Sequence, residues 1–224
     1  MYVWSGWGHM DGKRDLIISA SMRVFPRVGY HAATVDDILK EANVARSTFY
    51  SYFSNKREIY NDTVRVVIQA IVGTFKAGVD SIVHRFDGPD PLKREDIGEL
   101  ERAIAGLMTD VYTYLSLNAG MAQMFLNELV GIDDEMTAYF NDFEEKLTDQ
   151  FERLVRFGKK IGLVRELDQR RAAEFVVCGL IHLGWKVSAG QHTDEIEEVC
   201  SQFVAQHLRG LVRQSAMVTQ VVKA

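Results

Sequence analysis

The stretch from Arg46 to Tyr52 carries the side chains with the clearest chemistry in this sequence. It reads RSTFYSY and, as a helix, would place a cation, several hydroxyl groups and two phenol rings within about two turns. A polar, basic and aromatic surface of this kind is typical of a short helix that docks on the backbone and groove of DNA. These residues are therefore the first candidates for function.

Two short helices joined by a tight turn are needed to hold this surface. Thr34 is expected to begin the first, because its hydroxyl can cap the backbone and Asp37 adds negative charge to the first turn. Asn43 suits a left-handed residue at the corner between the helices. Asn55 and Glu58 form a capping pair for a long helix that follows. The spacing therefore predicts a helix-turn-helix.

The helices around the turn have recognisable apolar faces. An amphipathic first helix is predicted from about Lys13, with Pro26 near its end and Gly29 just after it. The second short helix of the motif is predicted over about 45–52. Together these elements predict a three-helix head that leads into the long helix.

At these positions the sequence resembles the N-terminal domain of the TetR (tetracycline-repressor-like) family of bacterial regulators. The resemblance covers residues 14–60 continuously and combines many positions at fixed spacing, rather than one short motif. The matching residues are Phe25, Gly29, Tyr30, Ala33, Thr34, Val35, Ile38, Ala42, Val44, Ser47, Thr48, Phe49, Tyr50, Ser51, Tyr52, Phe53 and Lys56.

The resemblance implies specific contacts with DNA. It implies that phosphates are contacted by Thr34, Ser47, Tyr52 and Lys56, and that base edges or phosphates in the major groove are approached by Arg46, Thr48 and Tyr50. Two positions depart from the family pattern: Asn43 replaces the usual Gly, and Ala45 replaces a capping Ser or Thr, which should cost roughly 1 kcal/mol. For any single one of these side chains, a half-buried aromatic or a solvated charge is the alternative.

Composition favours an all-helical, cytoplasmic protein. Of 224 residues, 47% are hydrophobic and 25% charged, and only three are proline, so long helices are possible. Two cysteines are too few for a disulfide framework, which favours a reducing cytoplasm. No apolar run approaches the ~18 residues of a membrane span, so no membrane is expected as a partner.

Charge separates the head from the rest of the chain. Residues 1–60 hold eight Lys/Arg and six Asp/Glu, whereas the remainder holds 18 and 25. A small DNA-binding head on an acidic body fits this asymmetry.

The predicted fold is all-α, with an N-terminal three-helix helix-turn-helix head on a larger helical body for ligand binding and dimerisation. The predicted divisions are 1–10 (flexible segment or cloning remnant), 11–60 (DNA-binding domain), 61–215 (effector-binding and dimerisation domain) and 216–224 (tail).

The last two helices, predicted at about 168–188 and 193–213, carry more apolar surface than a small core needs. The family that the chain resembles pairs these helices in a four-helix dimer interface, which suits a palindromic double-stranded DNA operator. The alternative is that both stripes serve the monomer core. The predicted interface residues are Phe175, Gly179, Leu183, Val199, Phe203 and His207.

A methionine- and aromatic-rich patch in the middle helices is a candidate effector pocket, because thioethers and rings form adaptable apolar cavities. The resemblance supports a cavity there and extends it to further phenylalanines. Ordinary core packing is the alternative for each residue. The candidates are Phe75, Met108, Tyr112, Met121, Met124, Phe125, Phe143, Phe151 and Phe175.

Other chemistry has little support. Cys178 and His182 are four residues apart, a spacing that can hold a metal, but a two-residue match is weak and no metal or other cofactor is predicted. Phosphate-loop and nucleophile-elbow motifs are absent from the sequence, so no enzyme is predicted. The favoured function is a repressor released from its operator by a small apolar or amphipathic effector. The alternatives are a DNA-bound structural or interaction protein without an effector, and an all-helical enzyme.

Overall fold

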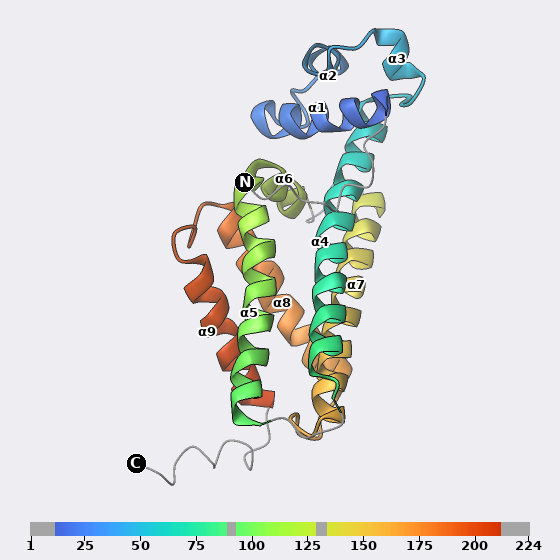
Figure 1. The fold of residues 1–224 in the computed structure, drawn as a ribbon. Coiled ribbons are helices and arrows are strands. Elements are labelled where there is room, and N and C mark those ends of the chain that lie inside the picture. The colour runs from blue at the N-terminus through green and yellow to red at the C-terminus, as the bar shows by residue number, and fades with distance from the viewer. Residues whose placement is uncertain (1–11, 89–92, 129–133, 212–224) are drawn as a thin grey trace.

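The structure is a computed structural model that describes residues 12–88, 93–128 and 134–211. Nine helices account for nearly all of the regular structure in these ranges, which confirms the all-α prediction. Helices α1–α3 form a head at one end of the long α4, and α5–α9 gather around the rest of α4 (Figure 1). The helices are α1 (Lys13–Val28), α2 (Val35–Ala42), α3 (Arg46–Tyr50), α4 (Lys56–Phe86), α5 (Arg94–Leu117), α6 (Ala119–Glu128), α7 (Asp134–Lys160), α8 (Gln169–Ser188) and α9 (Ile196–Leu211).

An aromatic and aliphatic core holds the head together. Phe25 of α1, Phe49 of α3 and Tyr60 of α4 are fully buried. The rings of Phe25 and Tyr60 meet edge to face with their centroids 5.4 Å apart, a favoured aromatic arrangement. Because α4 supplies Tyr60 to this core, the orientation of the head is tied to the direction of α4.

Helix α4 crosses the predicted division at residue 60 and belongs to both parts of the protein. It packs against α1 in the head and against α5 and α7 in the body. Contrary to the sequence expectation, one 18-residue window in α4 has a mean hydropathy of 1.5, enough by length and composition to cross a membrane. Core helices pass the same test, and α4 buries Ile68, Phe75 and Val79 against its neighbours.

Two predicted helix boundaries differ from the structure. Helix α3 ends at Tyr50 rather than at Tyr52, because its last turn tightens and the Tyr52 backbone N–H donates to the Phe49 carbonyl at 2.9 Å. Helix α9 begins at Ile196 rather than at 193, because His192 takes a left-handed conformation (φ 61°) and the chain is still turning there. In both places a turn replaces the expected helical residues.

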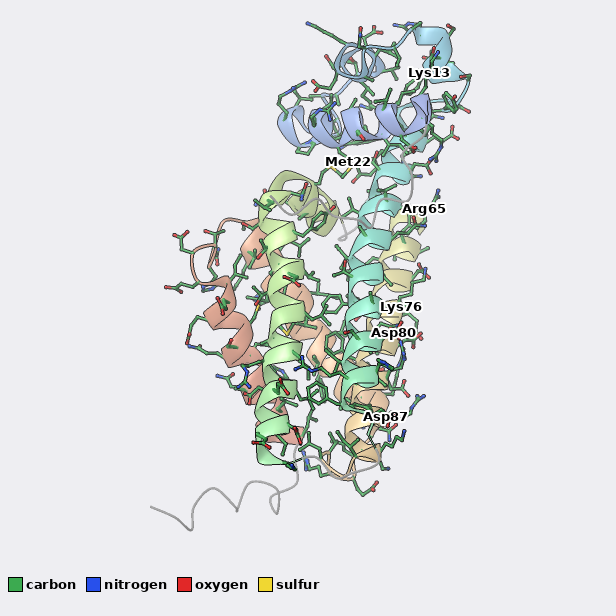
Figure 2. The ribbon with its side chains drawn as sticks, in the orientation of Figure 1. Lys13, Met22, Arg65, Lys76, Asp80 and Asp87 are labelled. Carbon is green, nitrogen blue, oxygen red and sulfur yellow. The ribbon has the colours of Figure 1, made fainter. Side chains whose placement is uncertain are left out.

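The head also touches the body through α1 and α6. A Cβ atom added to Gly120, at the start of α6, would lie 2.4 Å from the Cβ of Pro26 in the last turn of α1. Met22 lies on the side of α1 that faces α6 (Figure 2), and it is partly buried against the core. Besides α4, this close contact between α1 and α6 therefore connects the head to the body.

Candidate DNA-binding surface and body cavities

The predicted capping box forms at the start of α2. The Asp37 backbone N–H donates to the Thr34 hydroxyl at 3.1 Å, and the Thr34 backbone N–H donates to the Asp37 carboxylate at 2.9 Å. The Thr34 hydroxyl also donates to that carboxylate, and these hydrogen bonds hold the pKa of Asp37 below its ordinary value. Thr34 is exposed at the tip of the head, where a helix N-terminus attracts phosphate.

The turn between α2 and α3 forms as the sequence predicted. Asn43 is left-handed, with φ 53° and ψ 47°, and the Val44 backbone N–H donates to the Leu39 carbonyl. Ala45 is the N-cap of α3 and makes no side-chain capping bond. The two departures from the family pattern therefore leave the turn intact.

The side chains predicted to contact DNA lie on the outer side of α3 and the turn after it. Phe49 is fully buried and anchors α3, whereas Tyr50 is 49% exposed and Tyr52 is 42% exposed. Ser47 is exposed and Thr48 is half-buried. Large exposed rings beside hydroxyl groups form a surface that can meet a DNA groove.

Arg46 has a partner that the sequence did not suggest. Its guanidinium forms an ion pair with Asp36 of α2, and both side chains are more than half exposed. Exposed pairs of this kind contribute little stability, so a phosphate or a base can replace Asp36. Asp36 nevertheless places a negative charge on the surface that would face DNA.

We expect Asp36→Asn to strengthen DNA binding. Removing one negative charge near phosphate and freeing Arg46 should raise affinity for random duplex DNA by about fivefold, equivalent to about 1 kcal/mol. Fluorescence anisotropy at low salt measures this change. The control Glu99→Gln removes the acidic partner of Arg85 at the other end of α4 and should leave affinity unchanged. Equal gains for both variants would contradict the placement of Arg46 at the DNA surface.

Lys56, at the start of α4, is held by the head itself. Its Nζ donates to the carbonyls of Tyr30, His31 and Ala33 at 2.7, 3.1 and 2.7 Å. The same nitrogen lies 4.7 Å from the centroid of the Tyr30 ring. An ammonium group has three N–H donors, so these carbonyls occupy all of them. The predicted phosphate contact of Lys56 would have to compete with these bonds.

The structure divides the predicted effector residues among separate spaces. Phe75, Tyr112 and Phe143 line a cavity of about 40 Å³ between α4, α5, α7 and α8. The Tyr112 hydroxyl donates to the Leu180 carbonyl at 2.9 Å, and burial raises its pKa well above the ordinary value. Met108 and Phe151 line a second cavity of about 70 Å³ between α5, α7, α8 and α9.

Other members of the predicted pocket do not join these cavities. Met121 is buried in α6 but lines neither cavity. Phe175 was predicted to line the pocket in the middle of the body, yet it is 70% exposed on α8 and lines an open groove instead. Val176 and Val177 take the inward positions of that turn, so Phe175 points outward. The side chains of Met124 and Phe125 lie outside the described residues.

The predicted dimer residues also occupy different environments. Gly179 lets the Phe203 ring approach, since an added Cβ would lie 2.9 Å from that ring. Leu183 is buried within the monomer, and Val199, Phe203 and His207 are half-buried. The outward face of α8 instead carries Phe175, Cys178, His182 and Trp185.

His182 and Cys178, whose spacing can hold a metal, both lie on the outward face of α8, where His182 has an aromatic neighbour. Its ring stacks on Trp185, with centroids 6.1 Å apart. Among the described residues, no group of three or more His, Cys, Asp or Glu side chains is arranged to hold a metal ion.

A chain of polar contacts that links head and body was missed by sequence reasoning. Asp62 of α4 pairs with Arg14 of α1, and it also pairs with Arg65 one turn farther along α4. Arg65 extends the chain of contacts to the body, because its guanidinium donates a hydrogen bond to the Tyr139 hydroxyl of α7 at 2.6 Å. No local sequence signal could have found it, because Arg65 and Tyr139 are 74 residues apart.

The capped turn, the exposed face of α3 and the long α4 define a helix-turn-helix DNA-binding protein with a helical body. The sequence profile described as "Bacterial regulatory proteins, tetR family" matches residues 17–63. Residues 17–63 therefore form a DNA-binding domain of the TetR family, and the chain is a TetR-type DNA-binding transcriptional regulator. Regulators of this family are not enzymes, in agreement with the sequence prediction.

Several known proteins are similar to this chain in sequence or in structure. The fatty acid metabolism regulator protein of Bacillus subtilis is 27% identical over 164 residues, which cover 71% of this chain and 75% of that protein. The fatty acid degradation regulator FadR from Bacillus halodurans is 23% identical, with a TM-score of 0.67 over 92% of this chain and 100% of that chain. A complex of SmeT with triclosan is 15% identical, with a TM-score of 0.69 over 91% and 93% of the two chains.

These matches cover different lengths of the chain. Several other curated relatives match over only 51 to 75 residues, and the chain spans about a third of their length, from 28% to 38%. Their similarity is therefore limited to a short part of each protein. The two solved structures share the whole fold, and at their low identities they show the fold alone.

Proposed function

We propose that this protein is a cytoplasmic, homodimeric repressor that binds a palindromic operator and is released by a small apolar or amphipathic effector. The observation that carries the proposal is the exposed face of α3, with Tyr50 and Tyr52 standing out from a buried anchor, Phe49. A rigid anchor with exposed aromatic and polar side chains is what a recognition helix needs. The net positive charge of residues 1–60 supports the same assignment.

The chemistry of the body supports an apolar or amphipathic effector. Both cavities are lined almost wholly by aliphatic and aromatic side chains. Cavities of this kind bind ligands mainly through burial of apolar surface. The names of two similar proteins refer to fatty acid metabolism and degradation, and a third was solved with triclosan. Fatty acids and triclosan are apolar or amphipathic molecules, and we propose an effector of the same chemical class for this protein.

The polar chain through Asp62 offers a route from effector to DNA. Phe143 lines the 40 Å³ cavity and lies one helical turn from Tyr139 on α7. A ligand that displaces this part of α7 would move the partner of Arg65, and Arg65 shares Asp62 with Arg14 of the head. Differential binding of a few kcal/mol between two head positions is enough to release an operator.

Selection from random duplex DNA, followed by footprinting of the selected sites, tests the function. We expect a palindrome with half-sites ~34 Å apart or a multiple of that spacing, protected on both halves. Apolar and amphipathic compounds are then added to the complex, and release of DNA is measured. If no common sequence is selected, the proposal of a regulator that binds a specific operator is contradicted. If no compound releases the DNA, the proposal of a small-molecule effector is contradicted.

One observation favours the alternative of a DNA-bound interaction protein without an effector. The middle cavity, as the described residues line it, measures only about 40 Å³, close to the volume of one water molecule in the liquid. An effector there must displace side chains such as Phe75 or Phe143. Operator selection without release by any compound is the outcome that favours this alternative.

We expect Trp185→Glu to dissociate the proposed dimer. Trp185 is 40% exposed on the outward face of α8, and a carboxylate there would be buried opposite its copy. The dimer dissociation constant should rise by at least about 30-fold, equivalent to about 2 kcal/mol. Sedimentation velocity over a dilution series measures it. Leu117→Glu is the control, because Leu117 is 80% exposed on α5; a larger effect there would place the interface elsewhere.

A further inference from the structure

An open groove lies at the end of the body that is farthest from the head. It is lined by the connection before α8, the first turns of α8 and the last turns of α9, and its volume is about 510 Å³. Figure 1 shows these segments at the end of the body opposite the head. Its lining mixes two arginines with apolar side chains. The lining residues include Arg165, Leu167, Arg171, Phe175, Val176 and His207.

The groove adjoins the apolar cavity of about 70 Å³ between α5, α7, α8 and α9. Three residues line both spaces: Val176 of α8, and His207 and Leu211 of α9. Apart from His207, every described residue on the wall of this cavity is apolar. The two spaces therefore adjoin: an apolar cavity lies beside a groove of mixed lining, which we call the mouth.

The mouth carries positive charge on a body that is otherwise acidic. Arg165 is fixed in place, because its Nε donates to the Gly210 carbonyl at 3.0 Å and its backbone N–H donates to the Leu211 carbonyl at 2.9 Å. Among the described residues, no acidic side chain pairs with its guanidinium. Arg171 is 70% exposed and reaches Asp168 only at 3.9 Å. Two arginines against one carboxylate leave an unneutralised cation at the mouth.

We infer that this site binds an amphiphile with one anionic head group and an unbranched apolar tail. The head group is held by Arg165 and Arg171, since guanidinium groups bind carboxylates and phosphates through paired hydrogen bonds. The tail passes Val176 into the apolar cavity. Because that cavity is small, a long tail displaces Leu208 and Leu211, which are half-buried at the end of α9. Phe175 lies along the open side of the groove.

This inference deepens the proposed function and rests on it, because it names the effector class and places its site. Phe175 and His207 also belong to the proposed dimer face, so a bound tail would lie beside the partner subunit. Binding itself requires no DNA. The site and the regulatory role can therefore be tested separately on the whole protein.

Titration calorimetry with the purified full chain tests the site, with dodecanoate as the probe. Dodecanol supplies the same tail without charge, and butyrate supplies the charge without the tail. We expect dodecanoate to bind at least about tenfold more tightly than either, because the site needs both parts. Dodecyl phosphate shows which anionic head group is preferred, and tighter binding of either anion supports the site. Equal binding of dodecanoate and dodecanol overturns it.

Three variants locate the binding. Arg165→Ala combined with Arg171→Ala should weaken dodecanoate at least about tenfold and leave dodecanol unchanged. Arg156→Ala is the matched control, since Arg156 is exposed, paired with Glu152 and does not line either space. Val176→Phe narrows the junction and should shorten the longest tail that binds. Undiminished binding by the double arginine variant overturns the inference, and unfolding curves of each variant show that it remains folded.

The binding site and its regulatory role are contradicted by different experimental results. Dodecanoate that binds through the arginines but leaves the operator complex intact supports the site and contradicts its role as the effector site. Release of the operator by dodecanoate that persists in the double arginine variant supports the regulator and overturns this site. Occupation of the groove by the partner subunit would abolish binding in the dimer, and this result also overturns the inference.

Discussion

Replacing Lys56 with methionine is expected to destabilise the head by about 3 kcal/mol. The substitution removes the donor for the carbonyls of Tyr30, His31 and Ala33, of which the first and the last are partly buried. A buried acceptor left without a donor costs about 1–3 kcal/mol, and loss of the cation above the Tyr30 ring adds to this. Denaturant unfolding and hydrogen exchange at the start of α2 measure the loss.

The Lys56 variant also separates two roles for this side chain. Thr34 follows the clamped segment, so loosening that segment should weaken DNA binding through the geometry of the head. In that case the slope of log affinity against log salt stays nearly unchanged. A direct phosphate contact would instead lower the slope by about 0.9. Lys40→Met is the control, because it removes the same charge from α2 without these hydrogen bonds. Wild-type stability together with a lower slope would show a phosphate anchor.

Gly120→Ala is expected to push the head away from the body. The new methyl carbon would lie 2.4 Å from the Cβ of Pro26, and carbon atoms prefer about 3.5–4.0 Å, so α1 and α6 must separate by about 1 Å. Pro26 belongs to a rigid ring in α1 and cannot rotate away. Overpacking of this kind costs about 1–3 kcal/mol, whereas Gly to Ala in a helix normally gains about 1 kcal/mol.

The consequence for function is specific to the dimer. Each head stays intact, so affinity for random duplex DNA should not change, but the displaced heads should bind the selected palindrome about tenfold more weakly. Gly106→Ala is the matched control, because nothing lies within 4 Å of its added carbon, and it should be slightly stabilising. Equal operator affinity in both glycine variants would show that the α1–α6 contact does not set the head position.

Local signals explain why the head was predictable from the sequence. The Thr34 capping box, the left-handed Asn43 and the Asn55 cap each involve residues within a few positions of one another. The end of α3 was less predictable, because a helix of five residues can exchange its last turn for a tighter one at little cost. The resemblance to a family supplied the functional meaning of the exposed side chains.

In the body, the direction in which individual side chains point could not be predicted from the sequence. Helix α8 is apolar over most of its surface, so its periodicity could not decide that Leu183 lies inside the monomer while Phe175 lies outside. The predicted effector residues share a composition, yet some line two separate cavities, Phe175 lines a groove and Met121 lines none of these spaces. Composition identifies apolar side chains but not the direction in which a packed helix turns them.

The sequence by itself determined that this chain is all-helical and carries a capped helix-turn-helix with exposed polar and aromatic side chains on its second helix. These features follow from hydrogen bonds and steric limits within a few residues. Only the tertiary structure decided that Lys56 clamps the preceding turn, that Pro26 abuts Gly120 and that Arg165 stands at the mouth of an apolar groove. Each of these depends on contacts between segments far apart in the chain, whose positions are set by the packing of the whole core.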